Sequence, residues 1–182
     1  MFKHLGILVG LLIGLLIVFI ISAVSQVSHA DAPANNFYAR ALVGVGIVNN
    51  SGGSNFTYGL GAGYKFMPQW SAGLDYTYNT FTVPSPLTAN LSLILANIKY
   101  YFGDLPGLTA GLKLGVGTIS VSGTNAPASA SASNFTWGPT VGYDYSLTPN
   151  WALGAEANLL WVSNSNPSTN DLQILANIKY WF

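Results

Sequence analysis

The chain has 182 residues, of which six are Lys or Arg and six are Asp or Glu, so its formal net charge is zero. Half of the residues are apolar and only 7% are charged, whereas roughly 25% are charged in an average soluble domain. So few charges argue against a nucleic-acid-binding protein and against a disordered chain. The sequence has no cysteine, which excludes a disulfide framework and a thiolate site.

The first 30 residues have the pattern of an export signal. A basic start precedes an apolar run over residues 5–24, and the small residues Ser28 and Ala30 fit a signal-peptidase site. An uncleaved membrane helix is the alternative, because about 20 apolar residues can span a bilayer. We therefore expect a signal peptide over 1–30, cleaved after Ala30, and a single exported domain over 31–182.

The exported part contains an internal repeat. The segment at 94–100 recurs identically at 174–180, and the segment at 56–59 resembles that at 135–138. The offsets between matching segments vary, so the differences in length lie in the connections. The repeat predicts two homologous halves of four strands each.

Alternation of apolar residues with small or polar ones predicts eight strands. In chain order they are 37–48, 56–66, 70–80, 91–102, 108–119, 135–145, 151–162 and 171–182. Three of the connections are short and rich in Pro, Gly and Asn. The longer connections, rich in Ser, Asn, Thr and Gly, are 49–55, 81–90, 120–134 and 163–170. Short turns at one end and longer loops at the other are typical of an up-and-down antiparallel barrel.

The two faces of the strands differ sharply in composition. One face carries 18 aromatic residues and no charge, and Trp137, Tyr143 and Trp151 are among them. The other holds 12 of the 17 glycines and 8 of the 11 charges that follow residue 30. Because the interior of an eight-stranded barrel is just wide enough for side chains or one small ligand, we expect the aromatic residues to point outward, into lipid. The sequence therefore predicts an all-β fold, an eight-stranded antiparallel up-and-down transmembrane β-barrel.

One residue interrupts the pattern. Pro139 falls in the middle of a strand on the lipid face, where it cannot donate a hydrogen bond to a neighbouring strand. We expect a bulge near Gly138 and Pro139, with one carbonyl group satisfied by a water or a side chain inside.

The last strand carries the most specific resemblance to a known family. Its outward residues are Ile174, Ala176, Ile178, Tyr180 and Phe182. With its leader, its eight amphipathic strands and this ending, the chain resembles the OmpA-like group of bacterial outer-membrane barrels, to which OmpX and the opacity-type surface proteins also belong. The segment at 64–76 is similar to the second hairpin of that family.

This resemblance implies a location and partners. The protein is expected in the outer membrane of a Gram-negative bacterium, as a monomer surrounded by lipid. Both termini are expected on the periplasmic side and the longer loops outside the cell. The five outward residues of the last strand are then the signal that the barrel-insertion machinery reads.

The inward residues near the periplasmic end and the middle of the barrel form a polar cluster. Its members are Arg40, Lys65, Asp75, Asn97, Lys99, Lys113, Asp144, Glu156, Asn158, Asn177 and Lys179. Removing one partner of a buried ion pair costs about 3–5 kcal/mol, so we expect these groups to be paired. We interpret the cluster as a structural plug that fills the lumen, and a narrow conduit for small ions is the alternative.

The inward residues near the outer mouth are apolar. They are Val48, Leu91, Leu93, Ile119, Leu160 and Val162. These side chains either pack against the loops or admit a small hydrophobic molecule.

The sequence predicts a membrane protein and not an enzyme. Both histidines, His4 and His29, lie in the leader, so the exported domain lacks the usual general base as well as a thiolate nucleophile. We expect no cofactor, no metal and no nucleic-acid partner. The expected role is structural or porin-like, and the alternatives are a surface adhesin acting through its loops and uptake of small hydrophobic molecules. The longest loop, 120–134, is uncharged and poor in aromatic residues, which is an unfavourable composition for a binding hot spot.

Overall fold

The computed structural model describes residues 36–48, 54–83, 87–123, 130–163 and 169–182. The expected signal peptide and its cleavage site after Ala30 lie outside the described residues. Within the described ranges, no helix has the length and hydropathy needed to cross a membrane.

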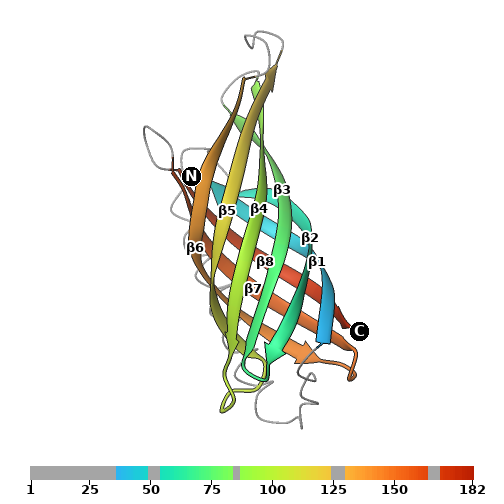
Figure 1. Ribbon diagram of the computed structural model, residues 1–182. Helices are drawn as coiled ribbons and strands as arrows, with labels where there is room; N and C mark the ends of the chain where they lie inside the picture. The colour runs from blue at the N-terminus through green and yellow to red at the C-terminus, as the bar shows by residue number, and fades with distance from the viewer. Residues whose placement is uncertain (1–35, 49–53, 84–86, 124–129, 164–168) are drawn as a thin grey trace, which may run out of the picture.

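The strands form one closed barrel in the order β1 to β8 (Figure 1). They are β1 (Asn36–Val48), β2 (Ser54–Met67), β3 (Trp70–Val83), β4 (Leu87–Tyr101), β5 (Leu108–Gly123), β6 (Ala130–Ser146), β7 (Trp151–Val162) and β8 (Thr169–Trp181). Every neighbouring pair is antiparallel, and β1 pairs with β8 to close the sheet. The predicted eight-stranded up-and-down barrel is confirmed. The identical segments of the repeat lie in β4 and β8, the last strand of each half.

Several strands extend further toward the long connections than alternation predicted. β5 continues to Gly123 and β6 begins at Ala130, so most of the expected loop at 120–134 is strand. Ser120 pairs with Ser131 there although neither side chain is apolar. Pairing of the backbone requires no apolar face, whereas alternation reveals only the part of a strand that has one.

Pro139 removes two residue pairs and inserts no bulge. β6 and β7 pair at Trp137 with Trp161 and again at Thr140 with Asn158, three residues further along each strand. Since the register is unchanged, the expectation of a bulge was wrong. Pro139 remains paired with β5, so its missing N–H affects the ladder with β7 alone.

The outer face is apolar and exposed, as the alternation requires. Trp137 and Trp151 are 46% and 43% exposed on it. Tyr143 occupies an outward position but is covered by Gly107 in the turn between β4 and β5. Gly107 has a φ of 88°, in the left-handed region that favours glycine, and a Cβ atom there would lie 3.0 Å from Cε2 of Tyr143.

Three aromatic side chains that were not among the 18 expected on the outer face lie toward the lumen. Tyr38 and Trp181 are buried there with their ring centroids 5.0 Å apart, and Tyr101 lies on the same side of β4 as Lys99. Glycines on β2 and β3 provide the space, because a Cβ atom at Gly63 or Gly73 would collide with the Tyr38 hydroxyl. The narrow lumen cannot hold 18 rings, but it accommodates a few where glycines face them.

Candidate functional site

Alternation along the strands brings charged side chains from distant parts of the sequence into one layer of the lumen. Arg40 on β1, Asp75 on β3 and Glu156 on β7 are each at most 3% exposed. Glycines at other inward positions leave room for these long side chains. A Cβ atom at Gly61 would collide with the Asp75 carboxylate and contact Arg40.

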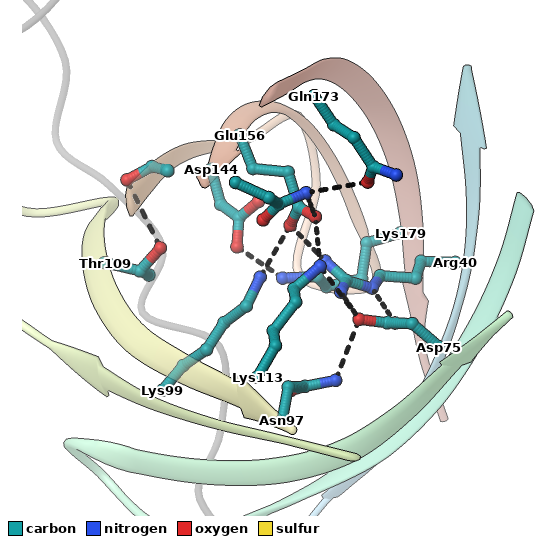
Figure 2. Close-up of polar contacts among 12 residues, drawn as sticks. Arg40, Asp75, Asn97, Lys99, Thr109, Lys113, Asp144, Glu156, Gln173 and Lys179 are labelled. Atoms are coloured by element: carbon teal, nitrogen blue, oxygen red, sulfur yellow. Dashed lines mark hydrogen bonds and ion pairs between the residues drawn. The ribbon is translucent and has the colours of Figure 1, made fainter. Parts of the chain in front are cut away.

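Glu156 is the centre of this layer (Figure 2). Its Oε2 atom accepts hydrogen bonds of 2.7 Å from Nη1 of Arg40 and of 2.7 Å from Nζ of Lys99. Its Oε1 atom accepts bonds from Nζ of Lys113 at 2.7 Å and from Nδ2 of Asn158 at 3.2 Å. The three bonds from cations are charge-assisted and therefore stronger than bonds between neutral groups. A single carboxylate thus joins side chains from β1, β4, β5 and β7.

Asp75 is the second anion of the layer. Arg40 holds it with two donors, Nε at 3.0 Å from Oδ1 and Nη2 at 2.5 Å from Oδ2. Nδ2 of Asn97 donates to Oδ2 at 2.9 Å, and Nζ of Lys113 lies 3.1 Å from the same oxygen. Because Arg40 and Lys113 each contact both Asp75 and Glu156, the two carboxylates belong to one network.

A second group of contacts surrounds Lys65 and Lys179. Lys179 forms an ion pair with Asp144, and its Nζ atom lies 3.5 Å from the Tyr101 hydroxyl. The ammonium group of Lys65 lies 4.8 Å from the ring centroid of Tyr101, and that of Lys179 lies 5.2 Å from the ring centroid of Tyr38. Cation–π contacts gain strength when they are desolvated, so these rings help to compensate for burying the two cations.

The residues expected in the polar cluster all face the lumen, but they do not form a single network. Arg40, Asp75, Lys99, Lys113 and Glu156 share ion pairs, and we call these five residues the ion layer. Asn97 and Asn158 donate hydrogen bonds to this group, and Asp144 and Lys179 form a separate pair. Asn177 is buried, yet its Oδ1 atom has no hydrogen-bond partner among the described residues.

Sequence reasoning missed several lumen residues that had the same strand parity as the predicted ones. The inward rings of Tyr38, Tyr101 and Trp181 are one such group. The other is Asp171 with Gln173 on β8, both almost completely buried. Parity with Lys179 on the same strand was the signal that could have identified Asp171 and Gln173.

Hydrogen bonds connect Asp171 to the ion layer. Nδ2 of Asn158 lies 3.4 Å from Oε1 of Gln173, and Nε2 of Gln173 donates to Oδ2 of Asp171 at 2.7 Å. Since Asn158 also donates to Glu156, a line of polar side chains runs from the ion layer to Asp171.

The apolar residues expected at the outer mouth pack against one another inside the lumen. Val48, Leu91, Leu93 and Leu160 form a buried cluster with Ala89 and Leu95, and Ile119 packs against it. Val162 is also fully buried. The lumen therefore contains an apolar layer in addition to the ion layer.

Asp75, Asp144 and Glu156 are all paired with cations, so none is placed as a free base or nucleophile. Among the residues that the structure describes, no group of three or more His, Cys, Asp or Glu side chains is positioned to hold a metal ion.

Solved structures of several bacterial barrels have the same fold. Neisserial surface protein A aligns with a TM-score of 0.65 at 20% identity, over 80% of this chain and 97% of that one. The attachment invasion locus protein Ail of Yersinia pestis aligns at 0.60 and 12% identity, over 82% of this chain and 100% of that one. The outer membrane protein OprG of Pseudomonas aeruginosa aligns at 0.54 and 14% identity, over 85% and 99% of the respective chains.

The search of curated proteins found no match to this sequence. The family described as outer membrane protein beta-barrel domain matches residues 16–179, which include all of β1 to β7 and most of β8. This match covers most of the chain and agrees with the closed barrel, its apolar exterior and its charged lumen. The chain belongs to the outer membrane β-barrel family.

Proposed function

We propose that this protein is a structural component of the bacterial outer membrane whose lumen is closed to solutes. The observation that carries the proposal is the network in which Glu156 binds Arg40, Lys99 and Lys113 at 2.7 Å each. These side chains come from opposite parts of the barrel wall and meet in the lumen (Figure 2).

The energetics of the network support a permanent plug. To open a path past Glu156, at least one buried ion pair would have to separate, and an unpaired buried charge costs about 3–5 kcal/mol. The apolar layer around Leu91, Leu93 and Leu160 is a second barrier, because these buried side chains pack against one another and offer no polar atom of their own to an ion. The proposed resting state is therefore one without conductance, and a narrow conduit for small ions is the competing function.

The orientation of the barrel in the membrane is a separate part of the proposal. We infer that the short turns, such as the one at 103–107, face the periplasm and that the longer connections face outward. Ile174, Ala176, Ile178, Tyr180 and Phe182 then lie at the end where the barrel-insertion machinery would recognise the last strand. The expected partners are membrane lipid and this machinery, and the protein functions as a monomer.

Recordings in planar bilayers test the proposal. Protein extracted from outer membranes and reconstituted should give no unitary current steps. The double variant Lys99→Ala with Glu156→Ala removes one cation and one anion together, and it should produce steps because it shortens two side chains that cross the lumen. Regular steps from the unmodified protein that disappear in Lys99→Met would refute the plug and favour the conduit.

The alternative roles have weaker support. One solved structure of Ail contains the heparin analogue sucrose octasulfate. In this chain the connections at 49–53, 84–86, 124–129 and 164–168 contain no Lys or Arg, so they lack the cations that a sulfated sugar would require. The packed apolar layer likewise offers less support for uptake of hydrophobic molecules than for closure. An enzymatic role finds no support either, because residues 31–182 contain neither His nor Cys.

A further inference from the structure

Asp171 is a buried acid whose surroundings differ from those of the other lumen carboxylates. It is 0% exposed, and its cross-strand neighbours Val48 on β1 and Leu160 on β7 are both apolar. None of the ion pairs among the described residues includes it. A carboxylate in such a place is strongly disfavoured unless it is neutralised or coordinated.

Polar atoms without partners converge beside Asp171. Its Oδ2 atom accepts the bond from Gln173, but Oδ1 has no partner among the described residues. The same holds for Oγ1 of Thr57 and for both amide atoms of Asn79, and these two residues are at most 1% exposed. Buried polar atoms in native proteins nearly always have partners, so several without one in the same place require an explanation.

Gly46 shows that these atoms surround one small space. A Cβ atom added at Gly46 would lie 2.8 Å from Nδ2 of Asn79, 2.8 Å from Oγ1 of Thr57 and 3.2 Å from Oδ1 of Asp171. The three side chains, from β3, β2 and β8, therefore point toward the same part of the lumen. A half-turn of the Asn79 amide exchanges Nδ2 for Oδ1, because the two orientations have nearly the same shape.

We propose that Asp171, Thr57 and Asn79 bind one small monovalent cation of the sodium type beside Gly46. A carboxylate, a hydroxyl and an amide oxygen are the hard oxygen donors that such a cation prefers. The single negative charge of Asp171 neutralises one positive charge, whereas a divalent ion would leave an uncompensated charge among Val48 and Leu160. The site lies beyond the ion layer, and it does not depend on whether the lumen conducts.

Thermal unfolding in different chloride salts tests the site. Protein extracted from outer membranes into detergent is unfolded in sodium chloride or in tetramethylammonium chloride at equal ionic strength, since the organic cation is too large to enter the site. Sodium should raise the unfolding midpoint in a saturable way. At a sodium concentration ten times the dissociation constant, the unfolding equilibrium constant should fall about tenfold.

Three variants locate the effect. Asp171→Asn and Thr57→Val should each abolish or greatly weaken the dependence on sodium, and Thr57→Val carries the test if Asp171→Asn fails to fold. Asp104→Asn is the matched control, because Asp104 is an exposed carboxylate in the turn at 103–107, and it should retain the full dependence. Relaxation of ²³Na in NMR provides a direct second measurement, and its rate should increase in the presence of the unmodified protein but not in the presence of Thr57→Val.

Several outcomes would overturn the proposal. Equal midpoints in the two salts would mean that Asp171 is neutralised by a proton, and Asp171→Asn would then be as stable as the unmodified protein in both. A sodium effect that persists in both Asp171→Asn and Thr57→Val would place the ion elsewhere. A larger saturable stabilisation by calcium chloride would contradict a monovalent site.

Discussion

Replacing Glu156 by glutamine should destabilise the barrel by leaving cations unpaired in the lumen. Glu156 accepts hydrogen bonds from Arg40, Lys99 and Lys113, and each of the three is 2.7 Å long. Arg40 and Lys113 retain Asp75 in the variant, whereas Lys99 has no second carboxylate within ion-pair distance among the described residues. Most of the lost stability should therefore come from the ammonium group of Lys99, which is left buried without an ion-pair partner.

The expected magnitude follows from that single charge. Breaking a buried ion pair from one side costs about 3–5 kcal/mol, and the middle of this range, about 4 kcal/mol, lowers the folding equilibrium constant by about 700-fold. Because Lys99 carries most of the penalty, the double variant Glu156→Gln with Lys99→Met should recover part of it. The coupling energy between the two positions should be about 1–3 kcal/mol.

Reversible urea unfolding in lipid vesicles, followed by tryptophan fluorescence, measures these free energies. Asp104→Asn makes the same chemical change at an exposed position in a turn, and it should alter the free energy of unfolding by no more than about 0.5 kcal/mol. The reasoning would be refuted if Glu156→Gln unfolded at the same urea concentration as the unmodified protein. A coupling energy near zero would show that Lys99 does not depend on Glu156.

Three further substitutions probe the wall of the barrel. Leu74→Lys places a charge on the exposed outer face, at a cost of about 2–4 kcal/mol if it lies at the midplane, and should lower the fraction of protein that migrates as folded on an unheated gel. The same change at Leu105, which is exposed in a turn, should leave the folded fraction unchanged. Equal effects of the two substitutions would contradict the assignment of the faces. Gly61→Ser should destabilise by about 1–3 kcal/mol in urea unfolding, because its Cβ atom would collide with Asp75, whereas Gly103→Ser, where a Cβ atom meets nothing within 4 Å, should be neutral. Gly107→Ala should cost at least about 1–2 kcal/mol in the same assay, because its φ of 88° is unfavourable for residues with a Cβ atom, and an unchanged midpoint would argue against this backbone conformation.

The sequence alone was sufficient to predict the architecture. Strict alternation, with aromatic residues on one face and glycines and charges on the other, permits only one arrangement in a narrow barrel. The repeat at 94–100 and 174–180 indicated two halves of four strands, and β7 begins and ends at the residues that alternation predicted. Alternation is read from neighbouring residues and the repeat from comparing two segments of the sequence, so neither requires the folded chain.

The partners inside the lumen were decided by the tertiary structure. Which cation meets which carboxylate depends on the register of strands that are far apart in the sequence, as in the contact between Arg40 and Glu156. Alternation alone would also tolerate a small residue at Gly61, and only the folded barrel shows the Asp75 carboxylate in that space. The inward rings of Tyr38 and Trp181 depend in the same way on glycines of other strands. Side-chain parity is a property of one strand, whereas filling a lumen is a property of all eight, and this is why the sequence predicted the wall more completely than its contents.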